Sequence, residues 1–206
     1  HKVVEENAMS KEESQYLSNY LLENNIPANF ECSNGIYATQ YTKDTMLKMV
    51  EEQCAGKSEE EKAKHGLTIL TNQVTVVDNI KDLVFNKVSV IDNGKTPYKK
   101  IQQDLSDKYD VIPATFAPLG KESGEITSYH INKAIGMDAI VKYFNADIKD
   151  TIAIGDGFND LPMFEKAHLS IAMGNAPQEI KDKADRITTS LDDDGIYHAF
   201  KELNLI

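Results

Sequence analysis

The sequence predicts an α/β protein in which a mixed α+β segment precedes a parallel sheet. After residue 132, short apolar runs alternate with stretches of helical periodicity, as in βαβ units whose sheet is buried on both faces. Before that point, β-rich runs and helices follow one another with hairpin-like spacing. The chain has 206 residues, enough for one large or two small domains. We therefore expect two domains, residues 1–131 and 132–206.

The N-terminal segment begins with a predicted helix over residues 10–25. Ser10 and Glu13 have the spacing of a capping box, in which each side chain bonds to the other residue's backbone N–H. Residues 28–41 then contain two β-rich runs around Asn34-Gly35, a pair that favours a tight hairpin because both residues tolerate positive φ. This part of the chain therefore combines helix and antiparallel strands.

A second helix is expected over residues 43–54, with Met46, Leu47 and Val50 facing inward. Residues 55–66 are highly charged and indicate either a solvated linker or a ragged helix. Residues 67–78 leave strand and helix both open.

Each of the remaining apolar or periodic segments predicts one strand or one helix. Strands are expected in residues 83–92, 110–118, 124–131, 151–156, 169–173 and 185–190. Helices are expected in residues 98–109, 132–145, 158–167, 174–184 and 195–204.

Charge and composition exclude several classes of function. A net charge of −11 argues against nucleic-acid or anionic-membrane binding, which needs a basic surface. No apolar stretch approaches the length of a membrane span. Cys32 and Cys54 form no metal-binding motif and the histidines are scattered, so zinc is not expected. We expect a reduced, cytoplasmic protein with both cysteines in packing positions.

The residues with the strongest chemical signal are in "TIAIGDGFNDLPMF", residues 151–164. Asp156 follows an apolar strand, and Asp160 lies one helical turn later. Ligands of open α/β sheets gather at the carboxyl ends of the strands. Two carboxylates there suit Mg²⁺, which takes one or two carboxylates together with water and substrate phosphate. The alternative is that both residues only cap and charge the start of a helix.

The same stretch carries a resemblance to a known family. "GDGFND", followed by "LPMFEKAHLSIAMGNAPQEIKDKADRITTSLDDDGI", is similar to the C-terminal signature of the haloacid dehalogenase (HAD) superfamily. The specific likeness is to its Cof-type phosphatases, subfamily IIB, and it covers residues 132–206. The resemblance implies that residues 132–206 are the C-terminal part of a Rossmann-like core. Residues 1–131 would be the mixed α+β cap domain, with the first few residues connecting core to cap.

The resemblance also implies roles for individual residues. Asp156 and Asp160 would hold Mg²⁺, and Asn159 would help to position the phosphoryl group. Lys133 would bind phosphate, and its positive charge would neutralise a phosphoryl oxygen and a nearby carboxylate nucleophile. Asn175, in the G-N-A turn, would shape the wall of the site.

One part of the family pattern is absent from the 206 residues. The family's nucleophile is the first Asp of a D-x-D-G-[TV] motif after the first core strand. Residues 89–96 offer only Asp92 before Asn93-Gly94, and Asp192-x-Asp194-Gly195 is followed by Ile196. We therefore expect that the chain lacks the N-terminal nucleophile segment. The core would then have unpaired strand edges, and we expect it to be stabilised by self-association, by rearrangement or by the missing segment.

The leading hypothesis is a Mg²⁺-dependent phosphatase that acts on small phosphorylated metabolites through an aspartyl-phosphate. Sugar phosphates or phosphorylated cofactors are the expected substrates, and the chain alone is expected to be inactive. The alternative is a non-catalytic, truncated module that binds a ligand or partner through its cap. An upstream reading frame that encodes D-x-D-G-T would favour the enzyme.

Overall fold

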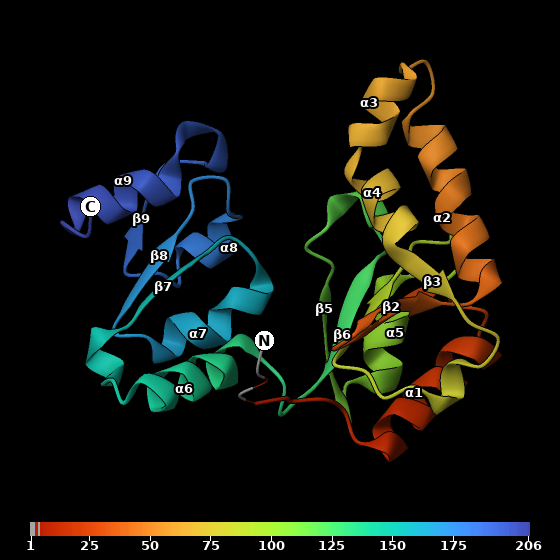
Figure 1. Ribbon diagram of the computed structural model, residues 1–206, viewed down its shortest axis with the longest axis horizontal. Helices are drawn as coiled ribbons and strands as arrows, with labels where there is room; N and C mark the ends of the chain where they lie inside the picture. Colours follow the sequence, from red (N-terminus) through yellow and green to blue (C-terminus); the bar gives the residue numbers. More distant parts are fainter. Residues whose placement is uncertain (1–2, 4) are drawn as a thin grey trace. The chain divides into compact units, whose positions relative to one another are not determined.

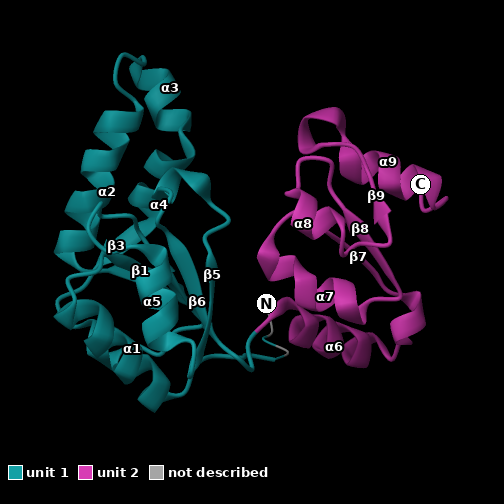
Figure 2. Ribbon diagram, turned by 180° about the vertical axis from the view of Figure 1, so that it is seen from behind, with its two compact units in different colours: residues 1–131 teal, residues 132–206 magenta. Residues whose placement is uncertain are grey.

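The computed structural model describes residue 3 and residues 5–206 of the chain. The chain divides into two compact units, residues 1–131 (unit 1) and residues 132–206 (unit 2), each with its own sheet (Figure 2). Within the described residues, we find no helix with both the length and the apolar character that a bilayer crossing requires. The architecture confirms the α/β class.

Unit 1 is built on a sheet that Figure 1 shows beside its helices. This sheet has six strands in the order β3-β2-β1-β4-β6-β5. Its strands are β1 (Ala28–Cys32), β2 (Gly35–Ala38), β3 (Val74–Val76), β4 (Lys87–Val90), β5 (Tyr109–Pro113) and β6 (Gly124–Ser128). Neighbouring strands are antiparallel, except that β2 and β3 are parallel. The parallel pair follows from the long helical crossover that joins these two strands.

The helices of unit 1 precede and connect these strands along the chain. They are α1 (Lys11–Glu23), α2 (Gln40–Gln53), α3 (Glu59–Lys64), α4 (Gly66–Gln73), α5 (Tyr98–Leu105) and the short 3₁₀ turns η1 (Ile80–Asp82) and η2 (Ala117–Leu119). The capping box is confirmed at α1, where Ser10 Oγ accepts from Glu13 N at 3.1 Å and Glu13 Oε2 accepts from Ser10 N at 2.7 Å.

The hairpin predicted near Asn34-Gly35 is confirmed, but its turn is shifted by one residue. Cys32 pairs directly with Gly35, so Ser33 and Asn34 form the two-residue turn and Gly35 begins β2. The side chain of Leu47, expected inside, is exposed on α2, whereas Met46 and Val50 are buried as predicted. Periodicity identified the helix and misplaced one edge of its buried face.

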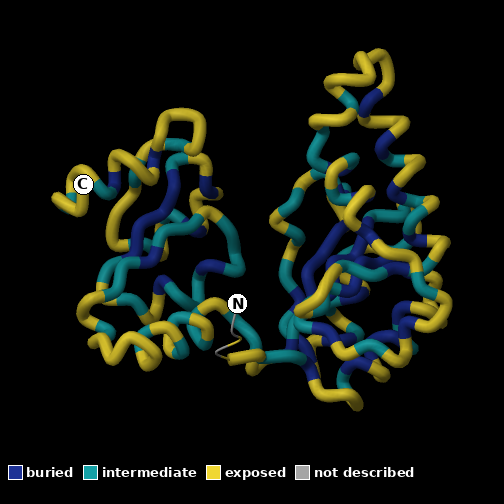
Figure 3. Tube along the Cα trace, viewed as in Figure 1, coloured by how far each residue is buried: buried dark blue, intermediate teal, exposed yellow. Residues whose placement is uncertain are grey.

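The sheet of unit 1 has one apolar and one polar face because its strands alternate. Ala28, Phe30, Val88, Val90 and Ile126 point to the core, where they pack against Leu17 and Leu21 of α1 and Ile101 and Leu105 of α5. The buried stretches in Figure 3 follow these elements. Alternate positions, such as Glu31, Lys87 and Glu125, belong to the opposite face. A second core, which includes Met46, Val50 and Leu67, lies under the crossover helices.

Unit 2 is a parallel three-stranded sheet with the order β7-β8-β9. Its elements are α6 (Lys133–Phe144), η3 (Ile148–Asp150), β7 (Ile152–Gly155), η4 (Phe158–Asp160), α7 (Leu161–Lys166), β8 (Leu169–Ala172), α8 (Gln178–Lys181), β9 (Arg186–Ile187), η5 (Leu191–Asp193) and α9 (Gly195–Glu202). Its small core combines Ala153 and Ala172 of the strands with Phe164 of α7 and Ile180 of α8.

Candidate functional site

The candidate site lies where β7 ends. Asp156 follows Gly155, the last residue of the strand, and Asp160 closes the 3₁₀ turn that leads into α7. Asp156 is exposed, and Asp160 is buried with 3% exposure. The two carboxylates that share one motif therefore occupy different environments.

The Asp160 carboxylate is held within the chain by three partners. Its Oδ2 accepts hydrogen bonds from the backbone N–H groups of Asp156 at 2.9 Å and Gly157 at 3.0 Å. Its Oδ1 forms an ion pair with Lys133 Nζ. Both oxygens thus have partners within the chain, although Oδ1 has only Lys133 among the described residues, and Asp160 fixes the shape of the loop that presents Asp156.

Gly155 makes this arrangement possible. A Cβ at residue 155 would lie 2.6 Å from Cβ of Asp160 and still closer to its carboxylate. Only a residue without a side chain lets the buried carboxylate approach the strand end this closely. The glycine that precedes Asp156 is therefore explained by packing.

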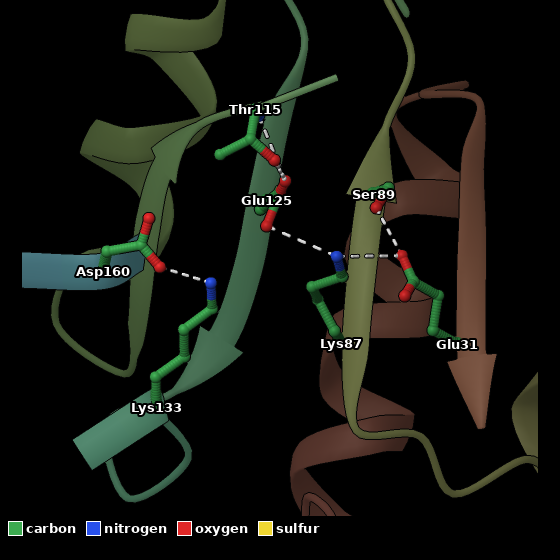
Figure 4. A network of polar contacts seen from close by, with 7 residues as sticks. All are labelled: Glu31, Lys87, Ser89, Thr115, Glu125, Lys133 and Asp160. Carbon is green, nitrogen blue, oxygen red and sulfur yellow. Dashed lines mark hydrogen bonds and ion pairs between the residues drawn. The ribbon is translucent and has the colours of Figure 1, made fainter. Parts of the chain in front are cut away.

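Lys133 is the first residue of α6, whose N-cap Asn132 accepts from the N–H groups of Ala134 at 3.0 Å and Ile135 at 3.2 Å. The lysine side chain is 48% exposed, although its amine meets the buried Asp160 carboxylate (Figure 4). Its charge is therefore anchored on one side and open to solvent on the other. The structure brings Lys133 and Asp160 together, a pairing that the sequence did not predict.

Asn175 has a larger place in the site than the sequence suggested. Its Nδ2 donates to Asp156 Oδ2 at 2.7 Å, and its Oδ1 accepts from Leu191 N at 3.0 Å. Asn175 thus orients the exposed carboxylate and ties it to the loop before α9. The G-N-A turn was the signal for this role. Asn159, in the 3₁₀ turn between the two aspartates, is partly buried.

The residues that were rejected as nucleophiles have structural roles. Asp92 Oδ1 accepts from Gly94 N at 2.8 Å, and Gly94 has a φ of 66°, so the chain turns directly after Asp92. Asp194 has a left-handed backbone at the start of α9, with a φ of 54°. Both stretches belong to loop structure in their own units.

The donor set fits Mg²⁺ only as part of a site. Among the described residues, there is no group of three or more His, Cys, Asp or Glu side chains placed to hold a metal ion. Asp156 offers a hard carboxylate oxygen at the surface, and buried Asp160 adds negative charge behind it. Mg²⁺ retains several waters and needs one or two protein carboxylates, so this pair fits it where substrate supplies further oxygens.

Comparisons with known proteins find similar phosphatases. The chain is 30% identical over 145 residues to a phosphoglycolate phosphatase of Nitrosopumilus maritimus, a match that covers 69% of this chain and 60% of the relative. It is 34% identical over 134 residues to the 5-amino-6-(5-phospho-D-ribitylamino)uracil phosphatase YitU of Bacillus subtilis, which covers 64% of this chain and 50% of the relative. The chain therefore spans only part of the length of its curated relatives.

A solved structure shows the same fold over the whole chain. A subclass IIB sugar phosphatase of the HAD superfamily superposes with a TM-score of 0.73 at 19% identity, covering 100% of this chain and 71% of that one. The family model for haloacid dehalogenase-like hydrolases matches residues 1–200. The chain belongs to the haloacid dehalogenase-like hydrolases.

Proposed function

We propose that the chain is part of a Mg²⁺-dependent phosphatase of the Cof type that acts on small phosphorylated metabolites. The observation that carries the proposal is the convergence of Lys133, Asp156 and Asp160 beside the carboxyl end of β7. The substrate class is supported by relatives whose names include a phosphoglycolate phosphatase and a sugar phosphatase. Sugar phosphates and phosphorylated cofactors are therefore the substrates to test first.

Each residue of the site has a distinct proposed task. Asp156, exposed and oriented by Asn175, would hold Mg²⁺ directly, and Asp160 would support it through charge and bound water. The ion, when bound, would neutralise charge on the phosphoryl group. Lys133 would bind a phosphoryl oxygen with the open side of its amine, and Asn159 would position the same group by donating a hydrogen bond.

The nucleophile is proposed to come from a segment outside residues 1–206, because these residues contain no D-x-D-G-[TV] motif. Unit 2 has room for such a segment. In the described part of the chain, β7 pairs only with β8, so its other edge has free backbone donors and acceptors. In α6, whose residues are all described, none is buried, and Ile140, Tyr143 and Phe144 are more than half exposed. These features support completion by further strands or by a second copy.

The test compares residues 1–206 with the same chain extended by the upstream coding segment. Hydrolysis of p-nitrophenyl phosphate with Mg²⁺ is expected from the extended chain only. Asp156→Asn in the extended chain should lower kcat by about 100-fold or more, because phosphoryl transfer depends on charge neutralisation at this site. Glu179→Gln, which likewise converts a carboxylate to an amide at an exposed position of α8, is the matched control and should keep full activity.

Two results would contradict the proposal. Turnover by residues 1–206 alone that disappears on Asp156→Asn would show that the nucleophile lies within them. An upstream segment without D-x-D-G-[TV], together with an inactive extended chain, would favour the non-catalytic module.

A further inference from the structure

A groove of about 300 Å³ lies on the polar face of the unit 1 sheet. Its polar wall is formed by side chains of three adjacent strands and of the segment after β5: Glu31, Lys87, Ser89, Thr115 and Glu125. All of its lining residues belong to unit 1.

The strand register brings the charged side chains together. Glu31 lies directly opposite Lys87 across β1 and β4, and Ser89 lies opposite Glu125 across β4 and β6. Lys87 Nζ consequently lies between two carboxylates, 3.3 Å from Glu31 Oε1 and 3.4 Å from Glu125 Oε2 (Figure 4). Cross-strand pairing thus builds a three-charge cluster on one face of the sheet.

Neighbouring donors fix both carboxylates. Ser89 Oγ donates to Glu31 Oε1 at 2.6 Å, and Thr115 donates to Glu125 Oε1 from its backbone N at 3.1 Å and its Oγ1 at 2.7 Å. The Glu125 side chain is only 6% exposed, whereas the Glu31 side chain is 33% exposed. No donor from the described residues reaches Oε2 of Glu31. This oxygen is the acceptor that remains available to a ligand.

The cluster has an excess of one negative charge. Burial disfavours the charged form of Lys87, but attraction to Glu31 and then to Glu125 outweighs it, so the pKa of Lys87 lies above its ordinary value. The lysine therefore stays protonated and forms ion pairs with two carboxylates. An anion in this groove would face both of them at close range, whereas a cation would be attracted.

The other wall of the groove is apolar. Ile36 of β2, Ile69 and Leu70 of α4, and Phe116 line it, and the side chain of Ile69 is exposed. Gly66, at the start of α4, leaves room for the Phe116 ring, since a Cβ at residue 66 would lie 3.0 Å from Phe116 Cζ. An apolar surface thus runs alongside a carboxylate pair.

We propose that this groove binds a small molecule in which an ammonium group is attached to an aromatic ring or a short hydrocarbon part. The ammonium group donates to Glu31, and the apolar part packs on Ile69, Leu70 and Phe116. Small-molecule sites combine these two features, a mostly apolar wall and a few polar groups that fix orientation. The proposal concerns binding alone, and its test requires no turnover.

Three probes with a common ring and different charge test the proposal. They are tyramine, neutral tyrosol and anionic 3-(4-hydroxyphenyl)propionate, titrated into the full chain while chemical shifts of the unit 1 amides are followed by NMR. Tyramine is expected to bind saturably at the groove residues and at least about tenfold more tightly than the anionic probe, a difference of about 1.4 kcal/mol. Equal affinities for the three probes, or no saturable shifts with tyramine, would overturn the proposal.

Charge variants provide a second, signed readout. Glu31→Gln removes the excess negative charge and should weaken tyramine binding at least about threefold, whereas Lys87→Gln doubles that excess and should strengthen it. Glu60→Gln on α3 is the matched control, since Glu60 also pairs with a lysine, at 2.6 Å, but is exposed and outside the groove. Its tyramine affinity should not change.

Changes in the same direction for Glu31→Gln and Lys87→Gln would contradict a role for groove charge. If either variant fails to fold, Ile69→Lys supplies the test, because this side chain is already 47% exposed and a new positive charge should repel tyramine. Unchanged tyramine affinity in Ile69→Lys would also overturn the proposal.

Discussion

Lys133 and Asp160 form an ion pair that joins the first residue of α6 to the turn before α7. The carboxylate is buried and also accepts from two backbone N–H groups, whereas the lysine side chain is half exposed. Loss of the two partners should therefore have unequal effects. Asp160 should contribute more to stability than Lys133, because its carboxylate is buried and the lysine side chain meets solvent.

Asp160→Ala should destabilise unit 2 far more than Asp156→Ala. The first change leaves two N–H groups without their acceptor and opens a gap beside Gly155, so the free energy of unfolding should fall by about 2 kcal/mol or more. The second removes an exposed carboxylate and should change it by less than about 0.5 kcal/mol. Urea unfolding measures both values, and hydrogen exchange of the β7 and β8 amides assigns the change to unit 2. Equal destabilisation by the two variants would contradict the division of roles.

Gly155→Ala should destabilise the same region, because the new Cβ would overlap the Asp160 side chain. A loss of about 1–3 kcal/mol in the free energy of unfolding is expected from this overpacking. Gly136→Ala is the control: no heavy atom lies within 4 Å of the added Cβ, and the residue is in α6. That variant should gain about 0.8–1 kcal/mol from helix propensity. A tolerated Gly155→Ala would show that the loop can relax around Asp160.

Mg²⁺ should bind residues 1–206 weakly, because two carboxylates leave most of the coordination shell to water. Isothermal titration calorimetry should detect this binding and its loss in Asp156→Asn. Glu179→Gln should leave the titration unchanged. Strong saturable binding that survives Asp156→Asn would place the metal elsewhere.

Asp185 links the start of the edge strand β9 to the central strand β8 and should make the stability of unit 2 sensitive to acid. Its Oδ2 accepts from Ser170 Oγ at 2.7 Å and from Ser170 N at 2.8 Å. The side-chain hydrogen bond, and then the backbone one, holds the pKa of Asp185 below its ordinary value of 3.8. A lowered pKa in the folded state means that the stabilisation is present above pH 3.8 and is lost as the pH falls through the folded-state value.

The stability difference between the wild-type chain and Asp185→Asn should therefore shrink on acidification below about pH 4. Urea unfolding at a series of pH values from 6 to about 3 measures it. Glu179→Gln should show no such trend. A difference that stays constant over this range would mean that Asp185 acts through packing alone.

Sequence patterns predicted those elements whose structure is determined by residues close together in the sequence. The capping box at Ser10 and Glu13 and the alternating strands of unit 2 depend on neighbours in sequence, and the structure confirms them. Residues 67–78 stayed open because they contain a change of element, the end of α4 at Gln73 followed directly by β3. Apolar content alone does not mark such a junction.

The candidate site shows the same difference between local and distant contacts. Asp156 and Asp160 were predicted from a contiguous motif, and Lys133 was predicted from the family resemblance. The bond from Asn175 to Asp156 depends on how the β7 and β8 ends meet in space. The close packing of Gly155 on Asp160 depends on the backbone path of the turn between them. No spacing in the sequence encodes those distances.

The crossover between β2 and β3 has a consequence for how this protein can diversify. It carries α2, α3 and α4, packs on its own small core and supplies Ile69 and Leu70 to the apolar wall of the groove. The charged wall comes instead from β1, β4 and β6, whose opposite faces pack in the main core. Separate stretches of the chain thus determine the shape of the groove and its charge. Substitutions in the crossover can change the shape without changing the charge, and substitutions in β1, β4 or β6 can change the charge without changing the apolar wall.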